Sequence, residues 1–437
     1  MSMVELKYTA TKKMDDDMTI AYTPTTMRNT TICHDCGPEV ANHHTERLTA
    51  IVDWLTTPIM APIERLRRRL VPIVTRMALA RHAPEFIQFL VKLRLGTIII
   101  RPDEHTSWRS RCLWEEAEQR GIKMYEFRPF GRPRTLFVAT FRGQTVTFDG
   151  LPRPAGPPSP ALDWMDNKSL MRQKLGAAGV PVAQGGTCVS VQCAHQLFSR
   201  LTPPVIVKPN LGSRSRHTTI HINNETVLLT AFQSAKRLSP WIIIEEELTG
   251  LVYRATVIGG RVIAIMRREP PHVIGDGQHT VRELVEIENQ LPARRGPIFH
   301  DIAVDPEADS ELARQNLSWE SNPPNGQIIT LNQKVSRVFG ASTTDVTDET
   351  HEDNITLFRR IAALLNEPLI GIDFIVSDIS QSWRKQNRSG VIELNSLPFI
   401  DLHHYPLRGK VRNTAGALWD LIFPTSRPLA PPPRQET

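Results

Sequence analysis

The sequence predicts a protein of the α+β class, on three observations. From Gly96 onward, short apolar runs alternate with segments of helical spacing, which is typical of strands interleaved with helices. The pair Gly259-Gly260 separates two such runs and favours a two-residue hairpin turn, which joins antiparallel strands. The length of 437 residues allows about two to four domains with buried cores.

Composition and charge exclude several functional classes. Lys and Arg number 52 and Asp and Glu 46, so the net charge of +6 suits anionic ligands but is too weak to argue for nucleic-acid binding. Five cysteines cannot form a disulfide framework, so we expect a reducing, cytoplasmic location. No apolar run approaches the roughly 18 residues of a membrane span, and the N-terminus lacks the apolar core of a secretion signal.

Periodicity divides the chain into five segments. The first is polar and aperiodic, the second combines helical spacing with a small α/β pattern, and the third is a stiff Pro-rich linker. The fourth carries the motifs that suggest chemistry, and the last is a Pro-rich tail. In order, the segments are disordered residues 1–50, the helical and α/β residues 51–150, the linker 151–160, the main domain 161–424 and the disordered tail 425–437.

The local elements follow from turn and cap signals. In the second segment, Gly121 ends an amphipathic helix, and Gly143 joins two strands. In the main domain, Gly179 and Pro181 end a helix that begins at Lys168. The predicted helices are 108–120 and 168–178, and the predicted strands are 96–100, 136–142, 144–148, 205–208, 218–222, 242–245, 253–258, 262–267, 370–376 and 391–395.

Three polar residues lie inside two buried-strand patterns. Asp373 stands in GIDFIV, and Glu393 and Asn395 stand two residues apart in VIELN, so alternation places the latter pair on one face. Carboxylates among Ile and Val are costly unless they are paired or bind a cation. Oxygen ligands of this kind suit Mg²⁺ together with substrate phosphates. Salt bridges at a strand edge are the alternative.

A second group of residues suggests nucleotide binding. Lys208 ends an apolar run, and a point charge at such a place can meet phosphates in a cleft. Residues 210–219 are small and basic, and their backbone N–H groups could cradle phosphates, although an ordinary basic hairpin looks similar. The run that ends at Glu245 and Glu246 leads into a connector that could offer backbone groups to an adenine edge or be a solvated turn.

A Cys-x-x-Cys pair stands in the polar N-terminal segment, with three histidines close by. Thiols and imidazoles are zinc ligands, but a second ligand pair with fixed spacing is missing from this segment. We therefore favour incidental cysteines over a zinc site. The residues concerned are Cys33, Cys36, His34, His43 and His44.

The order of these groups resembles the ATP-grasp superfamily, in particular the ligase domain of cyanophycin synthetase and the bifunctional glutathione synthetases. Strings that begin at Arg268, Thr344 and Val391 resemble family motifs, and the resemblance covers about residues 161–424. The Mur-ligase-like half of cyanophycin synthetase is not expected here. The residues that carry the resemblance in order are Lys168, Lys208, Glu245, Asp373, Glu393 and Asn395.

The resemblance implies two α+β lobes that grip ATP, preceded by a small α/β N-terminal domain. It implies ATP and two Mg²⁺ ions as cofactors, with Mn²⁺ as an alternative. Glu245 would accept from the adenine amino group, and Leu248 would donate its backbone N–H. The implied ATP contacts are Lys168, Lys208, Ser213, Ser215, Glu245, Glu246 and Leu248.

The resemblance also implies roles for the metal and substrate residues. Asp373 and Glu393 would bind one Mg²⁺, and Glu393 would bridge to a second ion held by Asn395. Arg254 would lie near the transferred phosphoryl group and act in catalysis with Lys208. Neighbours on a strand point to opposite faces, so one of two adjacent arginines is expected to lead in anion binding. The implied substrate contacts are Arg267, Arg268 and His403.

The implied function is that of an ATP-dependent carboxylate–amine ligase, which forms an amide or peptide bond through an acylphosphate. Its partners would be a small carboxylate and an amine, with an amino acid or peptide as substrate, and a homo-oligomer is left open. A phosphotransferase on the same scaffold is one alternative. The other is a nucleotide-binding regulatory protein without turnover, which is suggested by Ser215 and His217 at glycine-like positions and by Val252 in place of an acidic ribose contact.

Overall fold

The computed structural model describes the chain in several stretches. The described residues are 33, 43–49, 51–52, 55, 79–133, 135–154, 159–165, 167–210, 216–295 and 297–426. Ser213, Ser215 and most of the segments predicted as disordered therefore lie outside the described residues. Residues 43–49 are helical, so the disorder expected there is corrected.

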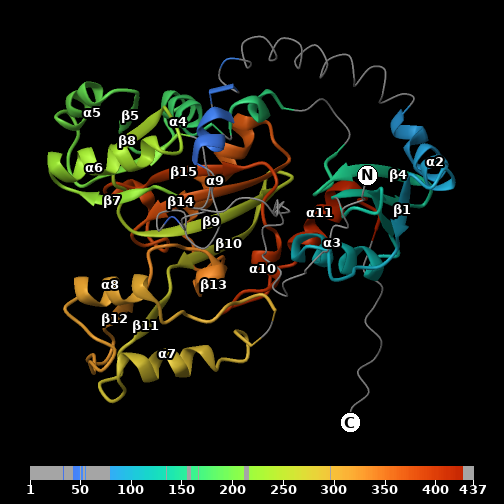
Figure 1. Cartoon of the computed structure of the whole chain (residues 1–437). Coiled ribbons are helices and arrows are strands. Elements are labelled where there is room, and N and C mark those ends of the chain that lie inside the picture. The colour runs from blue at the N-terminus through green and yellow to red at the C-terminus, as the bar shows by residue number, and fades with distance from the viewer. Residues whose placement is uncertain are drawn as a thin grey trace, which may run out of the picture.

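The N-terminal body is an antiparallel sheet in the order β1-β2-β3-β4 (Figure 1). Its strands pair antiparallel throughout, which corrects the small α/β domain expected here. Strand β2 was also not predicted from the sequence. The polar residues Glu126 and Arg128 interrupt its apolar run, yet both are buried and pair at 2.7 Å. The elements are α2 (Leu79–Lys92), β1 (Gly96–Ile99), α3 (Trp108–Gln119), β2 (Lys123–Pro129), β3 (Leu136–Phe141) and β4 (Gln144–Asp149).

Helix α11 (Thr414–Ile422), the last one within the described residues, completes the core of this N-terminal body. In Figure 1, α11 lies against α3 beneath the sheet. Trp419 of α11 is fully buried and donates its indole N–H to the carbonyl of Leu113 at 2.9 Å. Ile258 and Leu369 of the neighbouring large sheet belong to the same apolar cluster. The core therefore continues from the N-terminal body into the rest of the molecule.

The first lobe is a sheet in the order β5-β8-β6-β7, with α5 and α6 packed on one face. Val205 and Val207 face those helices, so Lys208 faces the other way. A disulfide joins Cys188 to Cys193 at the start of α5, which differs from the reduced thiols expected in a reducing compartment. The elements are β5 (Gly185–Cys188), α5 (Val191–Phe198), β6 (Val205–Pro209), β7 (Thr219–Ile222), α6 (Glu225–Lys236) and β8 (Ile242–Glu246).

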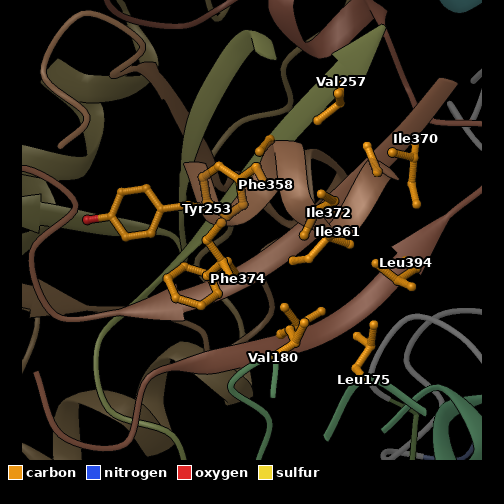
Figure 2. Close-up of a cluster of buried hydrophobic side chains, with 14 of the residues drawn as sticks. Leu175, Val180, Tyr253, Val257, Phe358, Ile361, Ile370, Ile372, Phe374 and Leu394 are labelled. Carbon is orange, nitrogen blue, oxygen red and sulfur yellow. The ribbon is translucent and has the colours of Figure 1, made fainter. Parts of the chain in front are cut away.

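The second lobe is an antiparallel sheet in the order β13-β10-β9-β14-β15. The hairpin predicted at Gly259-Gly260 is confirmed, since both glycines have positive φ. Helix α9 covers one face, where its Phe358 packs on Phe374 (Figure 2). The elements are α4 (Lys168–Ala177), β9 (Leu251–Ile258), β10 (Arg261–Glu269), β13 (Ser342–Asp345), α9 (Glu352–Leu365), β14 (Leu369–Val376), β15 (Gly390–Asn395) and α10 (Asp401–His404).

A small subdomain is inserted between β10 and β13, at the lower left of Figure 1. Its helices close over a two-stranded ribbon around their own apolar cluster. Among the described helices of the chain, none is long and apolar enough to cross a membrane. The elements of the insertion are β11 (His272–Ile274), α7 (Val281–Asn289), α8 (Pro306–Arg314) and β12 (Ile328–Thr330).

Candidate active site

Three charged residues form a row across the second lobe. The register of β9, β14 and β15 places Arg254 opposite Asp373 and Asp373 opposite Glu393. Directly opposed residues project on the same face of a sheet. Tyr253 and Phe374 face the α9 side, so the row lies on the face turned away from α9.

The row is shaped by an irregularity in β15. The pairing steps from Asp373/Glu393 to Phe374/Val391, so Ile392 is an extra residue in its strand. Such bulges re-aim neighbouring side chains and occur often beside active sites. Asn395 is opposite Gly371, where a Cβ would lie 3.3 Å from Cδ of Arg254 and 2.9 Å from Cβ of Pro398. The glycine therefore leaves the room that the Arg254 side chain occupies.

Asp373 and Arg254 form a buried two-point ion pair. Their side chains are 2% and 4% exposed, and Nε and Nη2 of Arg254 donate to the two carboxylate oxygens, the latter at 2.7 Å. Nη1 of Arg268 lies 3.5 Å from the same carboxylate. Burial acts to raise the pKa of Asp373, but the charge and hydrogen bonds of Arg254 outweigh it, so the pKa is lowered. Asp373 is therefore a carboxylate at neutral pH.

Glu393 has the opposite electrostatic environment. Its side chain is exposed at the edge of the row, and no ion pair of it is found among the described residues. The pKa of its carboxyl group is raised, first by desolvation from the surrounding protein and second by the charge of Asp373. Arg254 and Lys168 oppose this rise. A cation bound beside Glu393 would stabilise its ionised form and so offset the effects that raise its pKa.

The adjacent arginines predicted to bind an anion lie on opposite faces of β10. Arg268 is near Asp373 and donates to the carbonyl of Val335 at 2.8 Å. Arg267 is opposite Tyr253 and pairs with Glu269 at 3.0 Å, so it does not join the row. From the sequence alone, either arginine could have faced the site. The observed register places Arg268 on the face of the charged row and Arg267 on the opposite face.

His403 lies close to the charged row, and its imidazole is buried and uncharged. It is fully buried, and its Nε2 is 2.7 Å from Oγ1 of Thr256. Burial, followed by the charge of Arg254, lowers the pKa of His403 to about 3. The imidazole is therefore neutral at pH 7. Its Nδ1 is buried and makes no hydrogen bond among the described residues.

A second buried ion pair was missed from the sequence. Arg337, in the 3-10 turn Arg337–Phe339, donates to Asp401 at 2.6 Å, and both side chains are buried. Burial lowers the pKa of Arg268, and the positive charges of Arg254 and, to a smaller extent, Arg337 lower it further. The partners are 64 residues apart in the sequence. No local spacing could have indicated this pair.

Two lysines, Lys208 of the first lobe and Lys168 of α4, line one side of the site. Glu245 accepts from Lys208 and, at 3.3 Å, from Arg172, so each carboxylate oxygen has a cationic partner. Lys168 is the first residue of α4, which Asn167 caps through a bond to the N–H of Leu170. Lys168, Lys208 and Glu245 line a cavity of about 10 Å³ together with Ile392 of the second lobe. That volume holds about one water molecule.

The connector after β8 lines a larger hollow. The carboxylate of Glu246 accepts a hydrogen bond from the backbone N–H of Thr202 at 2.8 Å. It therefore stabilises the backbone around Thr202, which precedes β6. The backbone N–H of Leu248 makes no hydrogen bond among the described residues. Leu248 and Glu246 line a cavity of about 380 Å³, which shares Ala183 with the smaller one. A volume of this order is in the range of small-molecule sites.

The donor set around Asn395 fits the divalent cation that the resemblance implies. Its amide nitrogen is buried without a hydrogen-bond partner in the described part of the chain. Turning the amide by 180° would aim its carbonyl oxygen into the same space. Asp373 retains lone pairs beyond those that Arg254 engages, and Glu393 has no cationic partner at hydrogen-bond distance within the described ranges. Two carboxylates and an amide oxygen are ligands suited to Mg²⁺.

Comparisons with known proteins can now be placed beside this geometry. No family model matches the chain. The cyanophycin synthetase of Trichormus variabilis is 31% identical over 265 residues, which are 60% of this chain and 29% of the relative. The bifunctional glutathione biosynthesis protein of Pasteurella multocida is 30% identical over 271 residues, which are 60% of this chain and 35% of that protein. The chain thus spans about a third of the length of these relatives.

The fold leads to the same group of proteins. The crystal structure of a bifunctional glutathione synthetase from Pasteurella multocida matches 72% of this chain and 44% of that chain, with a TM-score of 0.55 and 24% identity. The mixed α+β architecture therefore matches that of a bifunctional glutathione synthetase, and the resemblance to this protein and to cyanophycin synthetase, predicted from the motif order, is confirmed. Over about 60% of its length, this chain is homologous to cyanophycin synthetase and to the bifunctional glutathione biosynthesis proteins.

Proposed function

We propose that the protein is an ATP-dependent carboxylate–amine ligase that works through an acylphosphate. The observation that carries the proposal is the charged row of Arg254, Asp373 and Glu393, with two lysines beside it, Lys208 of the first lobe and Lys168 of α4. Transfer of a phosphoryl group between two anions demands such an arrangement, because positioning and charge neutralisation supply most of the catalysis.

ATP would bind between the two lobes. Lys168 and Lys208 are the proposed phosphate contacts, and the N–H of Leu248 is the proposed donor to the adenine ring. The cavity at the lysines has a volume of about 10 Å³, which is room for about one water molecule, and Lys208 is paired with Glu245. Nucleotide entry therefore requires the lobes to separate and Lys208 to exchange one carboxylate for a phosphate. Lobe movements of this kind are common in enzymes that enclose ATP.

Two Mg²⁺ ions fit the chemistry of Asp373, Glu393 and Asn395. When bound, they would neutralise the charge on the phosphates and align the groups that react. Asp373 is kept ionised by Arg254, and Glu393 becomes a better ligand once it is deprotonated. Nη1 of Arg254 is buried and has no hydrogen-bond partner among the described residues, so it is available to a ligand oxygen.

The substrate carboxylate would approach Arg254 and Arg268. One of its oxygens would attack the γ-phosphorus of ATP, and the bond to ADP would break, giving an acylphosphate. An amine would then attack the acyl carbon, expel phosphate and leave the amide. Arg268 lies 3.5 Å from Asp373 and is 21% exposed, so its guanidinium can neutralise an incoming anion from the open side of the row. No protein nucleophile is required in either step.

The test uses the full chain with ATP, Mg²⁺ and a panel of amino acids and dipeptides. ADP release, phosphate release and an amide product identified by mass spectrometry are expected together. A carboxylate labelled with ¹⁸O should transfer one label to phosphate, because its oxygen bonds to phosphorus in the acylphosphate. Hydroxylamine in place of the amine should give a hydroxamate.

The alternatives give different results in the same experiment. ADP release with a phosphorylated product and no amide would identify a phosphotransferase. Nucleotide binding without ADP release for every acceptor would identify a regulatory protein. In either case the ligase proposal is refuted.

A further inference from the structure

A cluster of metal-ligating side chains lies outside the row of charges. Cys33, His43 and His217 each place one ligand atom within 4.8 Å of the others. The first two come from the N-terminal segment, and His217 precedes β7 of the first lobe. The cluster thus joins residues up to 184 positions apart. Cys36 and His34 lie outside the described residues and are not counted here.

Two of the three distances within the cluster are close to those between ligands of one zinc ion. Zinc binds thiolate sulfur at about 2.3 Å and imidazole nitrogen at about 2.0–2.1 Å, so tetrahedral ligands lie roughly 3.3–3.6 Å apart. Sγ of Cys33 is 3.5 Å from Nε2 of His217, and Nε2 of His43 is 3.2 Å from the same atom. The two imidazole rings are perpendicular, with an interplanar angle of 89°, so they do not stack.

The surroundings of His217 fix which nitrogen faces the cluster. Its ring is 2% exposed, and its Nδ1 lies 2.9 Å from Oγ of Ser234 on α6. A hydrogen bond at Nδ1 leaves Nε2 for the metal, which is the usual arrangement of a metal-bound histidine. A single ring nitrogen carries at most one proton, yet two other ligand atoms converge on Nε2 of His217. A shared cation satisfies all three atoms at once.

We propose that Cys33, His43 and His217 bind a zinc ion and thereby fasten the N-terminal segment to the first lobe. A thiolate with two imidazoles is a donor set that zinc prefers, and a fourth position remains for water or a further ligand. The ion pair between Glu46 and Arg216, at 2.6 Å, joins the same two segments one residue from His217. This second contact supports a defined docking of the segment.

The proposed zinc site includes a residue of the segment that is proposed to bind the phosphates of ATP. His217 lies near the end of residues 210–219, the stretch after β6 that is proposed to cradle phosphates. It has a φ of 50°, so its backbone is left-handed, a conformation that a non-glycine residue needs its surroundings to hold. Zinc at its side chain would hold one end of that loop in place.

The experiment measures zinc binding by the full chain without an affinity tag. Protein stripped with a chelator is titrated with Zn²⁺ against a chromophoric competitor, and Co²⁺ is used as a spectroscopic substitute. We expect one Zn²⁺ per chain, and a thiolate-to-cobalt charge-transfer band with tetrahedral d–d bands. Zinc affinity should fall as the pH is lowered, because protons compete for all three ligands.

Variants separate this site from incidental binding. Ser234→Ala should weaken zinc binding by about 10–100-fold, as the loss of an outer hydrogen-bond partner does. Cys33→Ser and His43→Ala should weaken it further, and Cys33→Ser should remove the charge-transfer band. His44→Ala is the matched control, since His44 is an exposed neighbour outside the cluster, and it should bind like the wild type.

A check of folding separates loss of zinc binding from loss of structure in these variants. Cys33 and His43 are only partly buried, so their replacements should leave the circular dichroism spectrum unchanged, which is checked first. Failure of the wild type to bind Zn²⁺ more tightly than the folded Cys33→Ser/His43→Ala double variant would overturn the proposal. A cobalt spectrum without the thiolate band would overturn it as well. Neither result depends on whether the protein is a ligase.

Discussion

Replacement of Glu393 by Gln separates the chemical role of the charged row from its structural role. Glu393 is exposed, its raised pKa means that its charge is disfavoured in the folded protein, and Gln keeps its shape. Because the substitution removes a charge that partial desolvation by the surrounding protein and the charge of Asp373 both disfavour, the free energy of unfolding should change by less than about 0.5 kcal/mol or rise. The loss should therefore appear in catalysis alone.

The expected magnitude follows from the charge that is removed. A carboxylate attracts a cation about 4 Å away by about 4 kcal/mol per unit charge at an effective dielectric constant of about 20. Since about 1.4 kcal/mol is a factor of ten in rate, the turnover number should fall by about 10³-fold. The apparent Mg²⁺ requirement should rise at the same time, because one ligand of the proposed site is weakened.

The assay is ADP release at saturating ATP over a Mg²⁺ series, with urea unfolding of the same samples. Glu352→Gln on α9 is the matched control, since this glutamate is 69% exposed and lies on the other side of the sheet. It should match the wild type in both measurements. If Glu393→Gln turns over at near the wild-type rate at every Mg²⁺ concentration, the assignment of this row to the metal site is wrong.

The remaining predictions concern other parts of the site. Asp373→Asn should lower both activity and stability, the latter by about 3–5 kcal/mol in urea unfolding, because it leaves buried guanidinium groups without their carboxylate. Because the pKa of Asp373 is lowered on folding, its carboxylate stabilises the folded protein above its unfolded-state pKa of 3.8, and this stabilisation is lost as the pH falls through its folded-state pKa. The free energy of unfolding of Asp373→Asn should therefore fall less steeply at acidic pH than that of the wild type. Arg268→Ala should raise KM for the carboxylate substrate about tenfold or more, whereas Arg267→Ala on the opposite face should leave it unchanged, and equal effects would contradict the placement. His403, whose pKa is about 3 in the folded protein against an ordinary value of 6.5, should stay neutral down to pH 5 in NMR of labelled histidine. Its contribution to stability is complete above pH 6.5 and declines on acidification, and a titration near 6.5 in the folded protein would refute its burial. Removal of zinc with a selective chelator at saturating Mg²⁺ should raise KM for ATP more than it lowers kcat, and an unchanged KM would separate the zinc site from the phosphate loop.

Local signals in the sequence predicted most of the second lobe. The Gly259-Gly260 turn, the buried runs around Asp373 and Glu393, and the helix that begins at Lys168 all appear where they were expected. These elements have strong local causes, namely a turn type that needs positive φ, apolar runs long enough for a strand, and an N-cap. Strand β2 was missed because the mutual pairing of Glu126 and Arg128 makes a buried strand look polar.

The sequence alone determined the order of the motifs, the class of the fold and which residue types were available for chemistry. Tertiary structure decided which of them meet. Strand register put Arg254 against Asp373 and turned Arg267 away, burial made His403 neutral, and folding brought His217 to Cys33. The physical reason is that periodicity reports the face on which a side chain lies, whereas its partner, its desolvation and hence its charge depend on segments far away in the chain.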